Sequence, residues 1–154
     1  MRRGLAAALG VLTLGACGGI SGALTFDDSV EIVVPAPMEV VSPPFKISWT
    51  GDLGSGEAFA VFVDRDPITP GRAISAAFED ACEGVPDCPD DAFLSARGVY
   101  VTAENELDIP FVGPRGGVDG AGALEVHRVT IVVVDEGGVR LDERAWTTEF
   151  RINR

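Results

Sequence analysis

Histidine chemistry in this chain depends on one residue, because His127 is the only histidine in the 154 residues. Any Ser-His-Asp or Cys-His arrangement for nucleophilic catalysis must therefore include it. His127 lies at the start of the apolar run VHRVTIVVVD, in register with Val129 and Ile131, so we expect it to be a half-buried strand residue. No serine stands in a Gly-x-Ser-x-Gly context. We therefore expect no catalytic residues and no enzyme, with a small hydrolase as the least favoured class of function.

Acidic residues gather at two places that could supply oxygen ligands to Ca²⁺. Asp64 and Asp66 flank an arginine in DRDP, and Asp87, Asp90 and Asp91 lie in PDCPDD. Calcium takes about six to eight oxygen ligands, and neither cluster has the spacing of an Asp-x-Asp-x-Asp-Gly loop. We expect no metal site and no cofactor, and keep Asp64 and Asp66 as the calcium candidates of an alternative interpretation.

The N-terminal segment has the layout of an export signal. Arg2 and Arg3 precede the uncharged run GLAAALGVLTLG, which ends at LGAC, residues 14–17. This ending resembles the lipobox of bacterial lipoproteins, in which an aliphatic residue and two small residues precede a cysteine. The resemblance implies cleavage after Ala16 and a lipid on the sulfur of Cys17. An ordinary secretory signal is the alternative, although Leu14 stands where its cleavage site would need a small residue.

The same resemblance implies a location for the protein. Residues 1–16 would be the signal peptide, and residues 17–29 would be the lipidated cysteine and a flexible tether of about 20 Å. The lipid on Cys17 would anchor the chain in a membrane of the bacterial cell envelope. Gly18 stands where an Asp often retains such proteins in the inner membrane, which favours the outer membrane, on a periplasmic or surface-facing side.

Cys82 and Cys88 are the two cysteines that remain once Cys17 is lipidated. An even number of cysteines in an oxidising compartment favours a disulfide. A redox motif would have two residues between the cysteines rather than five, and a zinc site would need two further ligands. We therefore predict a Cys82–Cys88 disulfide.

The charge of the chain is strongly negative. There are 24 Asp and Glu against 12 Lys and Arg, for a formal net charge of −12. Such a surface repels nucleic acid and anionic lipid headgroups, so we exclude DNA and RNA as partners. After the leader, no stretch approaches the ~20 apolar residues that a transmembrane helix needs.

Several segments alternate apolar and polar residues with period two, which predicts half-buried strands. They are residues 30–34, 45–50, 57–64, 107–111, 126–135 and 146–152. The DEGG sequence at residues 135–138 is typical of a hairpin connection between the last two. The residues expected to face the core are Val30, Ile32, Val34, Phe45, Ile47, Trp49, Phe59, Val61, Val63, Leu107, Ile109, Phe111, Val129, Ile131, Val133, Trp146, Thr148, Phe150 and Ile152.

Residues 67–97 have a different pattern. Ile74, Ala77, Phe78 and Ala81 are spaced as the apolar stripe of a short helix. The segment PDDAFLSA predicts a second short helix with acidic residues at its N-terminus, where the helix dipole favours them. We expect a helical insertion between strands, held by the disulfide.

Three segments resemble fibronectin type III and bacterial immunoglobulin-like domains. PFKISWTG is similar to their second strand with its buried tryptophan, HRVTIVVVDEGGVR to the penultimate strand and turn, and WTTEFRIN to the closing strand. The resemblance covers residues 30–153. It implies an all-β, antiparallel immunoglobulin-like β-sandwich, here a domain of residues 30–154. The inter-sheet cysteine pair of antibody domains is absent, and the insertion at about 67–97 departs from the pattern.

These observations favour a non-enzymatic, lipid-anchored envelope protein whose domain serves protein interaction or a structural role. The expected partners are the membrane, through Cys17, and another envelope protein. The alternative is a carbohydrate- or calcium-binding module whose site is formed by Asp64, Asp66 and the Cys82–Cys88 insertion.

Overall fold

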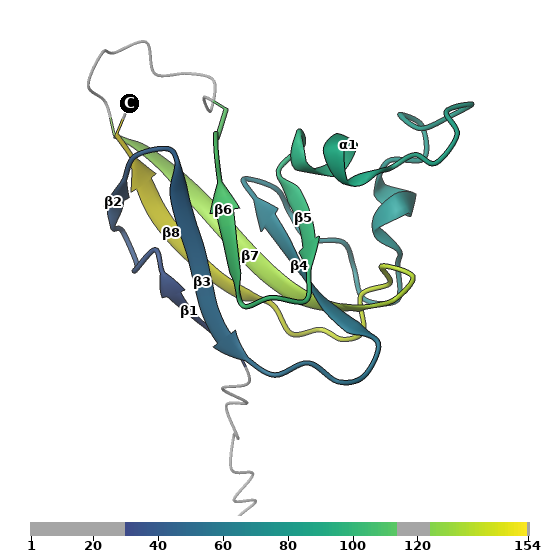
Figure 1. Ribbon diagram of the computed structural model, residues 1–154, viewed down its shortest axis with the longest axis horizontal. Helices are drawn as coiled ribbons and strands as arrows, with labels where there is room; N and C mark the ends of the chain where they lie inside the picture. The colour runs from purple at the N-terminus through teal and green to yellow at the C-terminus, as the bar shows by residue number, and fades with distance from the viewer. Residues whose placement is uncertain (1–29, 114–123, 154) are drawn as a thin grey trace, which may run out of the picture.

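Strands are the predominant regular elements of the fold (Figure 1). The computed structural model describes residues 30–113 and 124–153. The expected signal peptide, Cys17 and the tether lie outside the described residues. The elements are the strands β1 (Val30–Val34), β2 (Val40–Val41), β3 (Phe45–Gly51), β4 (Glu57–Val63), β5 (Val99–Thr102), β6 (Glu106–Ile109), β7 (Glu125–Asp135) and β8 (Trp146–Ile152), the 3-10 helix η1 (Ile74–Ala77) and the helix α1 (Asp91–Ser95).

The strands form two sheets. One has the order β1-β3-β6 and the other the order β2-β8-β7-β4-β5. All pairings are antiparallel except that of β2 with β8, which is parallel. In Figure 1 the three-stranded sheet crosses in front of β7 and β8. The expected all-β class is therefore confirmed.

The two sheets share an apolar core. Ile47, Trp49 and Ile109 from the three-stranded sheet pack with residues of β4, β7 and β8 such as Phe59 and Phe150. The rings of Trp49 and Phe59 meet edge to face, with centroids 5.3 Å apart. Burying each such side chain contributes about 1.5–3 kcal/mol, so this core is the main stabilising layer.

A second core lies on the outer face of the five-stranded sheet. Ala60 and Phe62 of β4 are buried there together with Val132 and Val134 of β7. They are covered by residues from the segment between β4 and β5, namely Ile68, Ile74, Phe78 and Leu94. Strand β4 is consequently buried on both faces, where the sequence predicted burial on one face only. The insertion explains the difference, because it adds a third layer over this sheet.

The segment between β4 and β5 contains less regular helix than its sequence predicts. The prediction of one helix through Ala81 was wrong, because η1 ends at Ala77 and is a 3-10 helix. No side chain caps its N-terminus, and the tighter 3-10 form is common in such short pieces. The second predicted helix is present as α1, where the Asp90 side chain accepts a hydrogen bond from the backbone N–H of Phe93.

The connection from β7 to β8 also differs from the prediction. The turn after Asp135 forms, with its carboxylate accepting from the backbone N–H groups of Gly137 and Val139. The chain then pairs Arg140 with Val134 instead of entering β8, which begins only at Trp146. Arg140 is buried and donates to the backbone carbonyl of Ile68, so this segment packs with the insertion.

Candidate functional site

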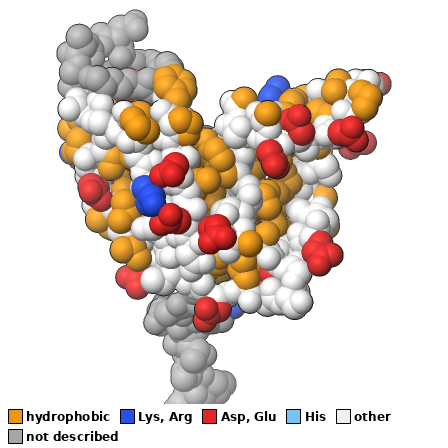
Figure 2. Space-filling view, viewed as in Figure 1, with side chains coloured by type: hydrophobic (Ala, Val, Ile, Leu, Met, Phe, Trp, Pro, Cys, Tyr) orange, Lys and Arg blue, Asp and Glu red, His pale blue; other side chains and the backbone are white. Residues whose placement is uncertain are grey.

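A cleft opens at one end of the fold, between α1 and the chain that follows β6. Its volume is about 740 Å³, within the size range of ligand sites. Figure 2 shows the surface hollowed at this place, with apolar side chains along the hollow. We call it the cleft, and its walls are residues 63–65, 95–98, Tyr100 and 110–113.

Asp64 forms part of the cleft wall at the end of β4. Its backbone φ of +56° lies in the left-handed region, which Asp adopts more easily than most residues. Its backbone N–H donates to the carbonyl of Arg128, and its carboxylate accepts from the Arg128 backbone N–H at 3.0 Å. The other carboxylate oxygen lies 2.5 Å from Nδ1 of His127. These contacts fix Asp64 between the end of β4 and the start of β7.

His127 lies behind Asp64 and has no solvent exposure. The expectation of a half-buried histidine was therefore wrong. Its ring stacks on that of Phe150, and its Nε2 lies 3.3 Å from a carboxylate oxygen of Glu125. Burial is complete because His127 lies on the same face of β7 as Val129 and Ile131, which are buried in the core between the two sheets. A ring enclosed in this way does not reach a molecule in the cleft, so its role is to position Asp64.

Two arginines stand at the cleft, and each stacks on an aromatic ring. The guanidinium of Arg65 lies 4.7 Å from the ring centre of Phe78, and that of Arg97 lies 3.5 Å from that of Phe93. The two rings meet edge to face, with centroids 5.5 Å apart. Arg97 donates to the backbone carbonyl of Phe93, and Arg65 to that of Arg97. Stacking and these hydrogen bonds hold both guanidinium groups in place.

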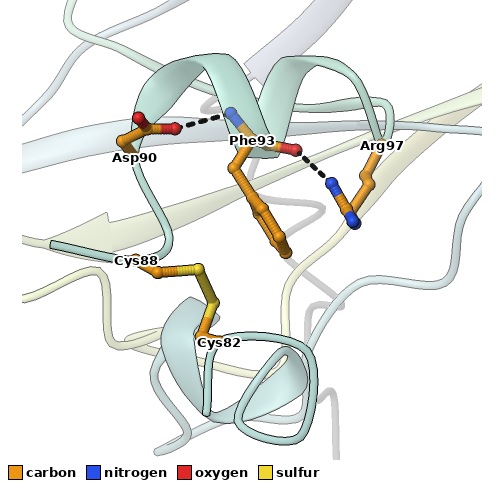
Figure 3. The surroundings of a disulfide bond; sticks show 5 residues. All are labelled: Cys82, Cys88, Asp90, Phe93 and Arg97. Atoms are coloured by element: carbon orange, nitrogen blue, oxygen red, sulfur yellow. Dashed lines mark hydrogen bonds between the residues drawn. A yellow bond between two sulfur atoms is a disulfide. The ribbon is translucent and has the colours of Figure 1, made fainter. Parts of the chain in front are cut away.

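The insertion supplies the support for this arrangement (Figure 3). The disulfide between Cys82 and Cys88 is present, as predicted, and joins the turns after η1 to the start of α1. The Asp90 cap then begins the helix that carries Phe93 and leads to Arg97. The disulfide thus ties the turns after η1 to the segment that begins α1, and its cysteines do not line the cleft.

Tyr100 and Phe111 provide the aromatic surface of the cleft. Tyr100 is half-buried, and burial raises the pKa of its phenol above the usual value. The prediction that Phe111 faces the core was wrong, because its side chain is 66% exposed. Pro110 has no N–H to continue the pairing of β6 with β3, so the strand ends at Ile109 and the alternation is lost.

The structure does not assemble the calcium candidates into a site. Asp64 contacts His127 and Arg128, whereas Asp66 is highly exposed and pairs with the Arg128 guanidinium at 2.5 Å. Across residues 30–113 and 124–153, no group of three or more His, Cys, Asp or Glu side chains is placed to hold a metal ion. The Cys82–Cys88 loop borders a separate cavity, so Asp64, Asp66 and the disulfide do not share one site.

Sequence reasoning missed the arginines and aromatic residues of the cleft. Arg65 drew notice only as the arginine between Asp64 and Asp66, and Arg97 and Tyr100 stand in no recognisable motif. The signal that could have identified Phe111 is the proline before it.

Comparison with known protein families, with curated proteins and with solved structures finds no match to this chain. In the part of the chain that the structure describes, no helix is long and apolar enough to cross a membrane.

Proposed function

We propose that this protein is a non-enzymatic, lipid-anchored protein of the bacterial cell envelope that binds another envelope protein. Its domain is an immunoglobulin-like sandwich, and the cleft is the binding surface. The lipid on Cys17 holds this domain at the membrane, with the outer membrane as the location that Gly18 favours.

The strand order supports the immunoglobulin-like assignment. The three-stranded sheet β1-β3-β6 corresponds to strands A, B and E of such domains. In the second sheet, β8-β7-β4-β5 corresponds to G, F, C and C′, so the insertion lies between C and C′. The tryptophan that the sequence resemblance placed on the second strand is Trp49 of β3, which is buried in the shared core.

The observation that carries the proposal is the composition of the cleft. It combines an exposed aromatic side chain, Phe111, with the two stacked arginines, and exposed aromatic and arginine side chains are the types enriched where proteins bind one another. Ser95 also lines it, but the chain's only histidine is enclosed behind Asp64. The cleft therefore offers contact surface rather than a nucleophile with its base.

Site-specific cross-linking in the producing cells tests this function. A photo-reactive benzophenone side chain replaces Phe111 in the cleft, and in a matched control it replaces Val33, which is also exposed but lies on β1. We expect one defined protein adduct from position 111 and none from position 33. Equal, diffuse labelling from both positions would contradict a protein-binding role for the cleft.

A further inference from the structure

We propose that the cleft receives an extended, acidic segment of the partner protein and that Arg65 and Arg97 bind a carboxylate of that segment. This inference rests on the proposed function and adds the chemistry of the partner.

The two arginines have donors available for an anion. Neither forms an ion pair with a carboxylate among the described residues, whereas Lys46, Arg128 and Arg144 do. A guanidinium carries five N–H donors, and each of the two uses one in the hydrogen bonds of the structure. Because stacking on Phe78 and Phe93 already holds their planes, little side-chain entropy is lost when a carboxylate binds.

The shape of the site suits a chain-like ligand. A groove of about 290 Å³ lies between α1, β5 and Leu107 of β6. It shares Ser95 and Tyr100 with the cleft, so the two hollows adjoin at these residues. Exposed apolar side chains lie along them, Phe111 in the cleft and Val101 in the groove. An extended peptide would lie along this path with alternate side chains on the apolar surface.

Strand β5 offers backbone groups to such a peptide. In the described part of the chain it pairs only with β4, so one of its edges has no partner strand. The bond from the Val63 N–H to the Gly98 carbonyl sets the ladder, in which alternate residues direct their backbone groups to β4. The groups of Val101 therefore face away from β4, and Val101 is 42% exposed. Edge strands of this kind bind peptides by adding a strand.

Charge complementarity selects an acidic partner. The chain has a net charge of −12, so its surface in general repels acidic peptides. In the cleft, Arg65 and Arg97 can supply attraction, because neither has a carboxylate partner among the described residues, whereas the Asp64 carboxylate in the same wall already contacts His127 and Arg128. Binding should accordingly depend on Arg65 and Arg97 and weaken with added salt.

Measuring peptide binding to the full-length lipidated protein in detergent tests whether the cleft binds an acidic segment through Arg65 and Arg97. The probes are a fluorescent hexapeptide of alternating Val and Glu, the same peptide with Gln for Glu, free glutamate, and an acidic oligosaccharide. We expect the Val-Glu peptide to bind best and the double variant Arg65→Gln/Arg97→Gln to weaken it by about tenfold or more. The control double variant Arg144→Gln/Arg151→Gln makes the same charge change and should leave binding unchanged.

A second variant guards against misfolding of the arginine variant. Phe111→Ala alters a side chain that is mostly exposed, so the fold should be retained while peptide affinity falls several-fold. Any one of four results would overturn the inference. They are binding of the Gln peptide equal to that of the Val-Glu peptide, equal competition by free glutamate, tighter binding of the oligosaccharide than of the Val-Glu peptide, and no effect of the cleft variants on binding.

The cross-linking assay separates this inference from the proposed function. If the adduct at position 111 disappears in Arg65→Gln/Arg97→Gln and persists in Arg144→Gln/Arg151→Gln, the acidic-segment proposal is supported. If the adduct persists in both, the inference fails and the protein-binding function stands. If no variant, including the unmodified background, gives an adduct, the proposed function itself fails.

Discussion

At the scale of single residues, the contact between Asp64 and His127 determines the geometry of the cleft wall. The histidine is enclosed, and the carboxylate is held in a left-handed backbone conformation by partners on β7. Removing one partner of a buried hydrogen-bonded pair leaves the other polar group unsatisfied, which is more costly than losing an exposed contact. The contact between Asp64 and His127 therefore stabilises the fold and also fixes the position of Asp64 in the cleft wall.

A double-mutant cycle measures this contact. We expect Asp64→Asn and His127→Gln each to lower the free energy of unfolding, with a coupling energy of about 1–3 kcal/mol in urea denaturation. The exposed pair Lys46–Glu106 is the control, for which a cycle should give about 0–1 kcal/mol. Additive effects at Asp64 and His127 would show that their proximity does not stabilise the fold.

Tyr100 provides a pH-dependent signal from the cleft, because it is the only tyrosine in the chain. Burial raises its pKa in the folded state, so tyrosinate absorbance should appear at higher pH in the native protein than in denaturant, where the pKa is about 10. The unfolded state then loses its proton first, and the stability contributed by the neutral phenol declines as the pH rises above about 10. Coincident titration curves would contradict this expectation.

At the scale of elements, the segment between β4 and β5 acts as a third layer. It covers Phe62 and Val132, which would otherwise form an exposed apolar face on the five-stranded sheet. It also carries both rings on which the cleft arginines stack. The same packing therefore protects the sheet and positions the cations.

Apolar burial should hold this layer more strongly than the disulfide does. We expect Phe78→Ala to cost about 3–5 kcal/mol, because the ring is buried against the sheet. The double variant Cys82→Ser/Cys88→Ser should cost only about 2 kcal/mol, since the disulfide closes a short loop. Val85→Ala in that loop, at an exposed position, is the control, with a change within about 0.5 kcal/mol. Chemical denaturation measures the loss of unfolding free energy in each of the three variants. A larger loss for Cys82→Ser/Cys88→Ser than for Phe78→Ala would contradict the expectation that apolar burial holds this layer.

At the scale of the whole molecule, the proposed lipid anchor and the negative surface have opposite effects on membrane attachment. A chain with net charge −12 is repelled by anionic headgroups, so under the proposed function the lipid on Cys17, and not the protein surface, would keep it at the membrane. Cys17→Ser should therefore leave the protein unprocessed or in the soluble fraction on cell fractionation. Cys82→Ser/Cys88→Ser is the matched control and should remain in the membrane fraction. A Cys17→Ser protein that is processed normally and recovered with membranes would exclude the lipoprotein assignment.

The sequence by itself determined the features that depend on neighbouring residues. Alternation predicted β3 and β8 with the correct faces, the spacing of Pro89 and Asp90 predicted α1, and an even remainder of cysteines predicted the disulfide. Each of these signals is local, because strand periodicity, helix capping and short-loop closure involve residues a few positions apart.

Only the tertiary structure decided the site. The burial of β4 on both faces, the enclosure of His127 and the stacking of Arg65 beside Arg97 all depend on segments that are distant in the chain. No periodicity within a strand reports what covers its other face, and no motif links residues 32 or 63 positions apart. The cleft therefore results from packing between the insertion and the sheets. The expected localisation of the protein, in contrast, follows from the sequence of its first seventeen residues alone.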